Sequence, residues 1–386
     1  MNKNFLPKIN TLFFKQIARN IVLKLNAFLD ILIPIKCKKY DSEKIALLDY
    51  SGIGDFLLNA YYINEYLKYF SMKKVSIIVS DLVYPIANHF FNQYDFVTIY
   101  PINIRRFEYN FLYRRQILSK IGCQSKLHSI HPTFDYNNYI IYSKIMSKSY
   151  IRYEGEPSFY NIISTNKKNE KIIKNPFGNK NVNIVNHFYI IFKNNISENP
   201  IFEPSEKKII DFFKSIEYPL TSFSLKEPYI VILTDSSSSY RTYPIQQWQE
   251  LLNLIPDHIN IVQLGKNSFP LVHKNLISLI DKTSLIESMS IIKKAKFVIG
   301  NETGLSHFAY LNNIQTAVIL GGGHYKRFLP SFLDFNVIYL IHKMECFECG
   351  WRCNQVKNAS YDQVPCITNI SPLYIFEILK QNGAFK

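Results

Sequence analysis

A polar turn that separates a short apolar run from a helix-like segment is the first place where residue types and spacing suggest chemistry. Glu302 and Thr303 follow the apolar run 297–300. Helical spacing begins at Gly304, with His307 one turn further on. A strand that leads directly into a helix directs unpaired backbone N–H groups and the positive end of the helix dipole at whatever lies beyond the sheet. Such a turn can bind an anion, most commonly phosphate; the alternative is an ordinary strand-to-helix connection.

Four cysteines near the C-terminus form a second group with chemical potential. Two residues separate Cys346 from Cys349, three more precede Cys353, and Cys366 follows after a further twelve. Four thiolates at such spacings can hold a tetrahedral Zn or Fe ion, and a small loop-rich segment gains folding free energy from that ion. Such a metal site would be structural, because four cysteines leave no open coordination position. Disulfides, or thiols outside any metal site, are the alternatives.

Strand-like and helix-like segments alternate along the chain and must position these groups. The first series is expected to contain strands at 44–50, 74–80, 96–101, 136–143 and 150–155, helices at 56–70 and 203–216, and a long loop at 164–183. The second series is expected to contain strands at 229–235, 259–265, 297–300 and 316–323, and helices at 244–255, 284–295 and 304–312. Alternating strands and helices form parallel βαβ units. The pattern therefore predicts an α/β protein of two Rossmann-like lobes, with ligands beyond the carboxyl ends of the strands, in the cleft between the lobes.

The expected domains follow from this alternation. They are an N-terminal amphipathic helix with its lead-in (1–43), an N-terminal lobe (44–220), and a C-terminal lobe (221–386) that includes the cysteine-rich knuckle at 346–366. A chain of 386 residues is long enough for two cores, and its 47% hydrophobic content is that of a globular protein.

The formal net charge of +15 favours anionic partners such as nucleic acid, acidic lipid or phosphorylated sugar. No Lys/Arg-rich tail or repeated aromatic–basic pattern marks a nucleic-acid groove, so nucleic acid is not expected as a partner.

The N-terminal segment has apolar residues at roughly helical spacing: Ile9, Phe13, Ile17, Ile21, Leu25, Phe28 and Leu32. This pattern suits a helix lying on an acidic membrane surface, and it also suits a helix packed on the protein's own body. Lys15, Arg19 and Lys24 interrupt every candidate membrane span, and no signal peptide is recognised. We therefore expect a cytoplasmic protein, with peripheral contact to the inner face of the cytoplasmic membrane if the helix lies on lipid.

Four segments together resemble glycosyltransferase family 9, the heptosyltransferase group of lipopolysaccharide biosynthesis. They are IALLDYSGIGDFLLNAYYINEYL, YIVILTDSSSSYRTYPIQQWQELL, TSLIESMSIIKKAKFVIGNETGLSHFAYLNNIQTAVILGGG, and the cysteine segment followed by CITNISPLYIFEIL. The resemblance covers roughly residues 44–125 and 228–385, and the order of the segments makes it more specific than any single motif. It implies the GT-B fold, in which two Rossmann-like lobes face each other, an acceptor lobe first and a nucleotide-sugar lobe second.

The resemblance implies that Asp55 is the catalytic base. Glycosyl transfer requires an acceptor hydroxyl to lose its proton as it attacks the anomeric carbon, and a carboxylate beside the flexible Gly52 and Gly54 can take that proton. Gly54 is also a candidate for contact with phosphate or acceptor. The alternative for Asp55 is a helix-start residue favoured only by the helix dipole.

The leaving diphosphate needs N–H groups or cations where negative charge develops. By the resemblance, Thr303, Gly304 and Leu305 supply the N–H groups, and Arg241 stands where the family usually has a phosphate-binding lysine. We expect His307 to orient this turn or to contact phosphate.

Two loops add further candidates. Ser237 and Ser238 lie in a serine loop whose hydroxyl and N–H groups can help to hold the diphosphate, unless it is a solvated linker. His324, Lys326 and Arg327 follow a glycine-rich segment and can clamp phosphate or acceptor, unless they form a solvated loop.

Two departures from the family pattern bear on the donor. Glu302, expected to face the donor sugar or its phosphates, stands where the family usually has Asp. One added methylene moves the carboxylate by more than about 1 Å, which can alter selectivity. Lys266 or Asn267 stands where an acidic residue would hold the donor ribose. Both departures put ADP-heptose in doubt as donor, while transfer itself stays plausible.

The sequence therefore predicts an inverting glycosyltransferase. It would move heptose or a similar sugar from ADP-heptose or another nucleotide-diphosphate donor to a lipopolysaccharide core, a surface polysaccharide or another lipid-linked acceptor. No Asp-x-Asp pair occurs in the chain, so we expect no catalytic cofactor, with Zn or Fe only as a structural ion at the cysteines. The alternatives are a non-catalytic nucleotide- or glycan-binding relative and a redox or regulatory role for the cysteines.

Overall fold

The structure is a computed structural model. It describes residues 18–19, 21–26, 28–30, 32–33, 39–130, 147–153, 170–173, 184–195, 204–266, 269–329, 335–350, 353–356 and 363–386. The chain divides into two compact units, one made of Met1–Ser51 and Leu67–Asn175, the other of Gly52–Tyr66 and Pro176–Lys386. The segment Gly52–Tyr66, which carries Asp55, therefore groups with the second unit. The domain boundaries expected from the sequence stay a prediction.

The first unit is built on a six-stranded parallel sheet with the order β3-β2-β1-β4-β5-β6. Its strands are β1 (Asp41–Asp49), β2 (Lys74–Ser80), β3 (Val97–Ile102), β4 (Gln124–Ser129), β5 (Ser147–Tyr153) and β6 (Glu170–Ile173). The central strands are buried at residues 45–49 of β1 and 75–80 of β2, as expected for a parallel sheet with helices on both faces.

Three helices of the first unit cover this sheet: α3 (Tyr84–Phe91), α4 (Ile104–Tyr109) and α5 (Phe111–Ile121). α4 and α5 begin at asparagine caps, where the side chains of Asn103 and Asn110 each accept a backbone N–H bond at 2.9 Å. Phe107, Leu118 and Ile121 pack from these two helices onto one face of the sheet.

The second unit also contains a six-stranded parallel sheet, with the order β12-β11-β10-β7-β8-β9. Its strands are β7 (Tyr229–Leu233), β8 (Asn260–Leu264), β9 (Leu276–Ser278), β10 (Phe297–Asn301), β11 (Thr316–Ile319) and β12 (Val337–Leu340). The chain runs outward from β7 to β9 and then returns to β10 on the other side of β7. In open α/β sheets, ligands bind where the strand order reverses in this way, so the carboxyl ends of β7 and β10 are the expected site.

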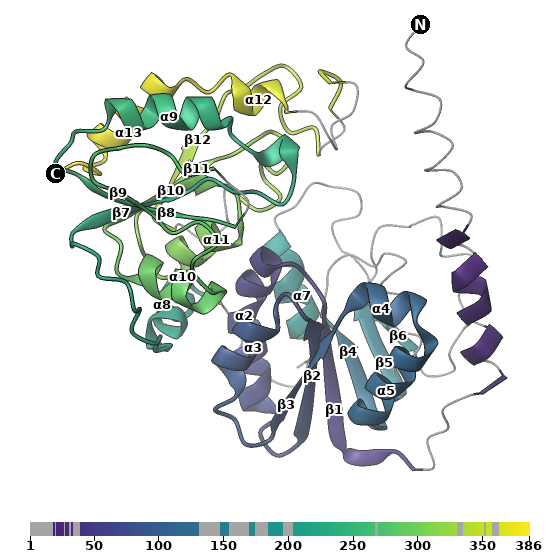
Figure 1. Cartoon of the computed structure of the whole chain (residues 1–386). Coiled ribbons are helices and arrows are strands. Elements are labelled where there is room, and N and C mark those ends of the chain that lie inside the picture. The colour runs from purple at the N-terminus through teal and green to yellow at the C-terminus, as the bar shows by residue number, and fades with distance from the viewer. Residues whose placement is uncertain are drawn as a thin grey trace, which may run out of the picture. The chain divides into compact units, whose positions relative to one another are not determined.

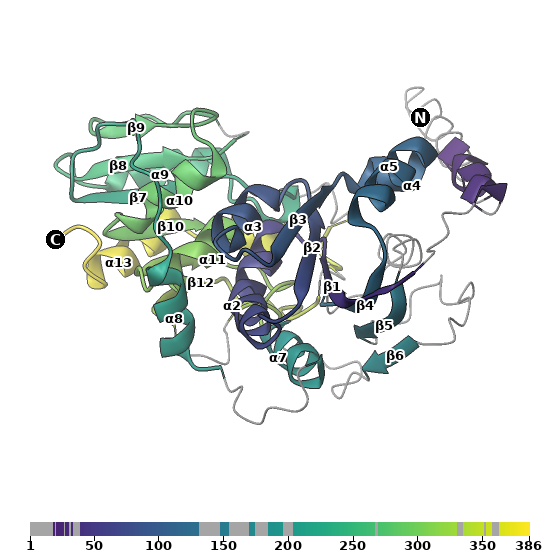
Figure 2. The same ribbon diagram turned by 90° about the horizontal axis from the view of Figure 1, so that it is seen from below.

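The second unit has helices that cover both faces of its sheet (Figures 1 and 2) and others that pack on one another. They are α2 (Ile53–Tyr69, of which Leu67–Tyr69 fall in the first unit), α7 (Ile184–Asn195), α8 (Glu206–Ser215), α9 (Ile245–Leu254), α10 (Leu285–Lys293), α11 (Gly304–Leu311), α12 (Pro365–Thr368) and α13 (Pro372–Gln381), with a short 3-10 turn η2 (Ser239–Arg241). α9 and α13 cover one face, and α10 and α11 cover the other (Figure 1). α2 packs against α7 and α8 through aromatic pairs, with Tyr62 stacked on Phe192 at 5.6 Å and Tyr61 edge-on to Phe212 at 6.1 Å.

The prediction of two parallel α/β sheets is confirmed. The predicted strand at 136–143 lies outside the described residues, as does most of the predicted loop at 164–183; within that range, however, residues 170–173 form β6, so this part of the prediction was wrong. β6 is short, and among the described strands it pairs with β5 alone, so its formation depends on tertiary contacts rather than on a strong local pattern. In the described part of the chain, no helix combines the length and hydropathy needed to cross a bilayer.

Candidate functional site

The carboxyl ends of β7 and β10 are joined by one buried asparagine. Asn301 ends β10, and its side-chain amide donates to the carbonyl of Thr234 at 2.7 Å. Its side-chain oxygen accepts the backbone N–H of Tyr243 at 3.0 Å. Asn301 therefore holds the loop after β7, which carries Arg241, against the turn after β10. The sequence analysis missed this residue, although a polar side chain directly after a buried apolar run is the signal that marks it.

The turn after β10 leads into α11 with Thr303 at the cap position. The Thr303 side chain makes no capping hydrogen bond. Ser306, in the first turn, instead donates its hydroxyl to the carbonyl of Asn301 at 2.6 Å. The backbone N–H groups of Gly304 and Leu305 have no acceptor within the helix, because the first turn of any α-helix lacks the preceding carbonyls. They are therefore suited to an anion.

The start of α2 lies directly against the start of α11 within the second unit. A Cβ added to Gly304 would stand 2.5 Å from Ile53 Cγ2 and 3.0 Å from Gly54 N. A Cβ added to Gly54 would stand 3.0 Å from His307 Cδ2. The two glycines thus allow two helix N-termini to approach, and their dipoles add at one place. Asp55 occupies the first turn of α2 beside this contact and is half-buried.

We expect the Gly304→Ala substitution to lower the free energy of unfolding by about 1–3 kcal/mol, because the new methyl group overlaps Ile53 and forces α2 away from α11. Nucleotide binding should weaken in parallel. Gly52→Ala is the matched control, because its Cβ would lie 3.8 Å from the nearest atom, which is ordinary contact. Urea unfolding of both variants measures the difference, and equal stabilities would contradict the close packing of the two helix starts.

Glu302 is the centre of a buried charge cluster. Its side chain is almost fully buried, with Oε1 2.7 Å from His307 Nε2 and Oε2 2.5 Å from His324 Nδ1. Arg241 Nη1 lies 3.3 Å from the same Oε2. Burial alone would raise the pKa of Glu302, but hydrogen bonds from His307 and His324 hold it well below its ordinary value. The carboxylate is therefore charged at neutral pH, and both imidazoles must donate to it.

His307 extends this cluster to Tyr310. The imidazole Nδ1 lies 2.7 Å from the phenol oxygen. Burial raises the pKa of Tyr310 well above its ordinary value, so the phenol keeps its proton and can donate it to Nδ1. That bond leaves Nε2 as the protonated nitrogen facing Glu302, which fixes the orientation of the ring.

Arg241 lies at the boundary between the cluster and solvent. One guanidinium nitrogen contacts Glu302, and Nη2 donates to the hydroxyl of Ser237. The side chain is 18% exposed, so the guanidinium can contact a ligand while it is held from behind. Ser238 lies next to this contact, and its carbonyl accepts the hydroxyl of Thr242 at 3.0 Å. The structure therefore brings the serine loop and Arg241 together, and their role in binding stays a prediction.

The structure separates the three basic residues of the loop after β11. His324 reaches Glu302, but Lys326 forms an exposed ion pair with Glu348 at 3.0 Å. Arg327 lies over the ring of Phe328, at 5.5 Å. Of these three, only His324 joins the cluster around Glu302.

Asp235 contacts the end of β8. Its carboxylate accepts the backbone N–H of Lys266, and a Cβ on Gly265 would lie 2.8 Å from Asp235 Oδ2. The sequence analysis looked for an acidic residue after β8 and did not find one. The structure places the Asp235 carboxylate there, from the end of the neighbouring strand β7. The order of the strands in the sheet could have suggested this residue.

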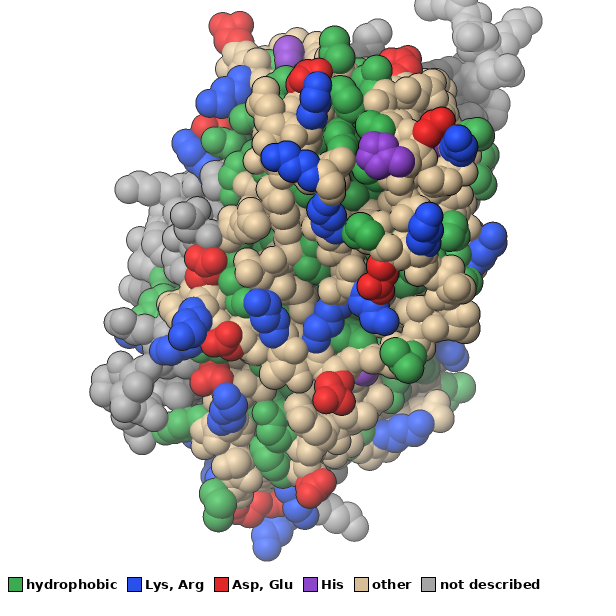
Figure 3. Space-filling model, turned by 90° about the vertical axis from the view of Figure 1, so that its left-hand side faces the viewer, with side chains coloured by type: hydrophobic (Ala, Val, Ile, Leu, Met, Phe, Trp, Pro, Cys, Tyr) green, Lys and Arg blue, Asp and Glu red, His purple; other side chains and the backbone are tan. Residues whose placement is uncertain are grey.

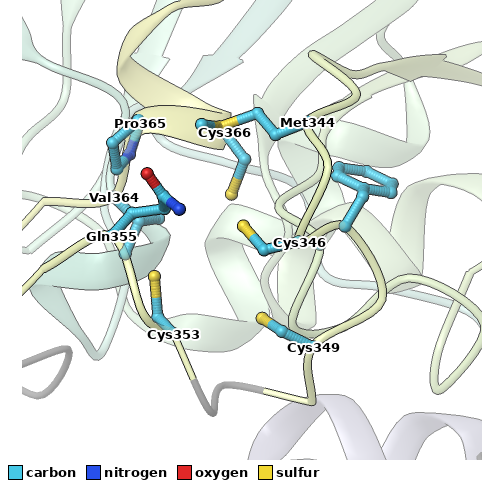
Figure 4. A pocket seen from close by; sticks show the side chains of 10 residues that line it. Met344, Cys346, Cys349, Cys353, Gln355, Val364, Pro365 and Cys366 are labelled. Carbon is cyan, nitrogen blue, oxygen red and sulfur yellow. The ribbon is translucent and has the colours of Figure 1, made fainter.

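The four cysteines surround one pocket. Cys346, Cys349, Cys353 and Cys366 line it together with Gln355, and Figure 4 shows their sulfur atoms turned towards the same hollow. All four are thiols, so the disulfide alternative does not hold for them. Within the described residues, no group of three or more His, Cys, Asp or Glu side chains is arranged closely enough to hold a metal ion.

Cys366 is the most buried of the four. Burial raises the pKa of its thiol, the nearby thiols of Cys349, Cys353 and Cys346 raise it further, and a hydrogen bond from the Gly322 backbone N–H lowers it. Four sulfur atoms that affect one another electrostatically are costly to ionise together without a cation among them.

Comparison with known proteins shows what the chain is similar to. Residues 186–319 match the model of glycosyltransferase family 9 (heptosyltransferase). No curated protein matches the chain by sequence.

Several solved structures share the fold. E. coli heptosyltransferase WaaC with ADP-2-deoxy-2-fluoro heptose matches with a TM-score of 0.61 at 14% identity over 88% of this chain and 100% of that chain. E. coli ADP-heptose lps heptosyltransferase II matches with a TM-score of 0.57 at 13% identity over 88% of this chain and 98% of that chain. The iron-containing dodecameric glycosyltransferase TibC from enterotoxigenic E. coli H10407 matches with a TM-score of 0.52 at 15% identity over 90% of this chain and 77% of that chain.

The family model covers the turn after β10 and the whole cluster at Glu302 except His324. The solved structures match both parallel sheets as one GT-B fold. The resemblance expected from the sequence is thereby confirmed over residues 186–319, and the chain has a GT-B fold similar to that of the heptosyltransferases.

Proposed function

We propose that the protein is an inverting transferase that moves heptose or a similar sugar from a nucleoside-diphosphate donor to a surface-glycan acceptor. The observation that supports this most directly is the arrangement at the switch point of the second sheet. An arginine anchored by a buried carboxylate, Arg241 on Glu302, lies at the same sheet edge as the uncapped N-terminus of α11. Together they suit a pyrophosphate, which carries charge over several oxygens.

Asp55 would act as general base in this reaction. As the acceptor hydroxyl attacks the anomeric carbon, its proton passes to the Asp55 carboxylate and the bond from that carbon to the diphosphate oxygen breaks. The electron pair leaves with the nucleoside diphosphate, whose growing charge Arg241 and the N–H groups of Gly304 and Leu305 stabilise. A single displacement of this kind inverts the anomeric centre.

The donor is proposed as a nucleotide heptose because two similar structures, WaaC and TibC, hold ADP-heptose or its fluoro analogue. Glu302 is proposed to act behind the donor site rather than on the sugar, since both of its oxygens already contact imidazole nitrogens. Asp235 and Lys266, at the end of β8, are candidates for the nucleoside end of the site.

A panel of nucleotide sugars tests the proposal by thermal stabilisation, because a ligand that binds only the folded state stabilises it according to its affinity and excess. A nucleoside-diphosphate sugar should raise the unfolding temperature more than its monophosphate, and the same donor should support transfer. If a donor stabilises the wild type but no turnover occurs with any of a broad set of acceptors, the binding-protein alternative is the better one. If no diphosphate compound stabilises the protein, the proposed pyrophosphate site is wrong.

We also propose that the four cysteines hold a structural Zn or Fe ion. Four thiols that share one pocket and form no disulfide fit such an ion by donor type, although small shifts would be needed to bring them to ligand distance. A bound ion would supply folding free energy to the loop-rich C-terminal segment and take no part in sugar transfer.

Metal analysis of purified protein should find about one Zn or Fe ion per chain. Cys346→Ser should lower this content and the unfolding temperature, because it removes one ligand. Met344→Leu is the control, since Met344 lines the same pocket without a thiol and should keep the ion. A metal-free wild type that is as stable before as after chelation would exclude the ion.

We further propose that the protein acts at an anionic membrane surface, through the helical residues at 18–32. Asp30 in this segment forms a buried ion pair with Arg114 of α5 at 2.8 Å, and the Asn26 amide donates to the Tyr109 carbonyl at 3.1 Å. The polar face of the helix is therefore packed on the first unit. Its apolar residues point outward, with Ile21 60%, Leu25 56%, Phe28 54% and Leu32 59% exposed.

The charge around this apolar face favours anionic lipid. Exposed or half-exposed basic side chains occur on the helix and on α4 and α5: Arg19, Lys24, Arg105, Arg106 and Arg115. The segments 18–33 and 104–121 contain two acidic residues. Asp30 pairs with Arg114, and Glu108 is buried. On the face shown in Figure 3, by contrast, Lys and Arg side chains are spread among Asp and Glu.

The protein should sediment with vesicles that contain anionic phosphatidylglycerol and not with neutral phosphatidylcholine vesicles, and salt should release it. Replacing Leu25 and Phe28 together by Ser should weaken binding about tenfold or more. Met72→Ser, at an even more exposed apolar residue of the same unit, is the control. If the double variant instead abolishes self-association and the wild type ignores vesicles, this face binds a second copy of the chain.

A further inference from the structure

The chain after β11 has two faces with different partners. This segment, residues 320–329, is called the glycine loop below. On one face, His324 directs Nδ1 at Glu302 and its ring packs on Phe328 with centroids 4.7 Å apart. Backbone bonds close the loop on itself, with the His324 N–H donating to Gly321 O at 3.2 Å and the Phe328 N–H to His324 O at 3.2 Å. The loop therefore holds His324 as a compact unit.

The other face of the glycine loop lies on the cysteine turn, residues 344–350. Gly322 lines the pocket of the four thiols together with Cys366. A Cβ on Gly322 would stand 2.9 Å from Phe347 Cδ2 and 3.1 Å from Glu348 N, so only glycine fits at this distance. Tyr325 adds a ring contact with Phe347 at 5.1 Å. The loop is thus packed on the same residues that line the thiol pocket.

We propose that the four-cysteine cluster positions the donor site through this loop: by holding Gly322, it holds His324 on Glu302 and keeps Arg241 aimed at the donor pyrophosphate. Gly322 and His324 are two residues apart, so a shift of the cysteine turn moves the imidazole with it. His324 is a positioning residue, because it touches Glu302 and not the ligand. The inference rests on the proposed pyrophosphate site. The contact between the cysteine cluster and the glycine loop does not depend on that site.

The physical basis is that one carboxylate, that of Glu302, accepts hydrogen bonds from several nitrogen donors. His324 and Arg241 share Oε2, at 2.5 Å and 3.3 Å. When the imidazole withdraws, this buried oxygen loses its shortest bond, and the guanidinium is the nearest donor that can replace it. Arg241 would then turn inward, away from the position in which it can bind phosphate. Loosening the cysteine turn is therefore expected to weaken anion binding without changing any residue that touches the anion.

A double-mutant cycle tests this path, with inorganic pyrophosphate as probe because it requires no choice of nucleotide base. Gly322→Ala pushes the loop off Phe347 while leaving all four thiols, Glu302 and Arg241 in place. It should weaken pyrophosphate binding about tenfold, measured by titration calorimetry, since a displacement of about 1 Å can cost more than this. In a His324→Leu background, Gly322→Ala should weaken pyrophosphate binding by less than a further twofold, because the contact between the loop and Glu302 is already lost.

The conservative variant and hydrogen exchange separate positioning from a general loss of structure. His324→Asn keeps an N–H near the Nδ1 position, so it should retain most of the affinity that His324→Leu loses. Amide exchange of residues 321–329 should speed up in Gly322→Ala and after Cys366→Ala, while exchange in β7 stays unchanged.

Two results would overturn the inference: fully additive losses in the cycle, or unchanged affinity and unchanged exchange in Gly322→Ala. If the wild type does not bind pyrophosphate, the donor site and its control by the cluster are refuted. If amide exchange of the glycine loop still depends on Gly322 and Cys366 in that case, the contact between loop and cluster stands. The two failures are therefore distinguishable.

Discussion

Replacing Asp55 with Asn is expected to reduce the turnover number by about 10²–10⁴-fold, the range that a positioned general base contributes. The amide has nearly the same shape but cannot take the acceptor proton. Donor binding should stay within a few-fold of wild type, because the pyrophosphate is held by Arg241 and the start of α11. Steady-state transfer kinetics together with nucleotide calorimetry separate the two effects.

The stability of the Asp55→Asn variant should change by no more than about 1 kcal/mol, since the carboxylate also interacts with the α2 dipole. Asp211→Asn, which removes an exposed carboxylate on α8 of the same unit, is the matched control and should keep full turnover. Asp55→Asn with wild-type turnover would show that Asp55 is only a helix-start residue. The base would then have to be sought elsewhere.

Replacing Glu302 with Gln is expected to have the largest combined effect on stability and binding. The substitution keeps the volume but removes the charge that faces two imidazoles and a guanidinium. Removing one partner of a buried charged network costs about 3–5 kcal/mol of unfolding free energy. Pyrophosphate or nucleotide affinity should fall about 10²-fold, because Arg241 loses the contact that aims it.

Glu348→Gln is the control for this substitution. Glu348 also forms a 3.0 Å ion pair, but with Lys326 at an exposed site, so its loss should cost about 0–1 kcal/mol and no affinity. Glu302→Asp keeps the charge with a shorter reach and should recover part of the affinity. If Glu302→Gln binds and turns over donor like the wild type, the cluster neither supports Arg241 nor sets the donor site.

The regular elements were largely predictable because their signal is local. The strand expected at 74–80 is β2, and the strand expected at 229–235 is β7 at Tyr229–Leu233, since continuous apolar runs of this length mark buried parallel strands. The helix starting at Gly304 was placed at its first residue by the polar turn before it. By contrast, β4 at Gln124–Ser129 was missed, because a sequence of mostly polar residues becomes a strand only between β1 and β5.

The candidate site was predictable as a set of residues but not as a set of contacts. Glu302, Arg241 and His307 were each singled out, and the expectation that Glu302 would face the donor sugar followed from motif position alone. The structure instead shows its oxygens engaged with nitrogens of His307, His324 and Arg241. Lys326, chosen for its charge and loop position, pairs with Glu348 on the surface.

The sequence by itself determined the parallel α/β class, the glycines at the helix starts and the spacing of the four cysteines, because each depends on residues close together in the chain. Tertiary structure alone decided that Arg241 meets Glu302, 61 residues away, since this contact exists only because β7 and β10 are neighbours in the sheet. It also decided that the N-terminal helix turns its apolar side outward, because Asp30 finds Arg114 84 residues later. Local periodicity specifies which face of an element is apolar, whereas strand order and packing specify what that face meets.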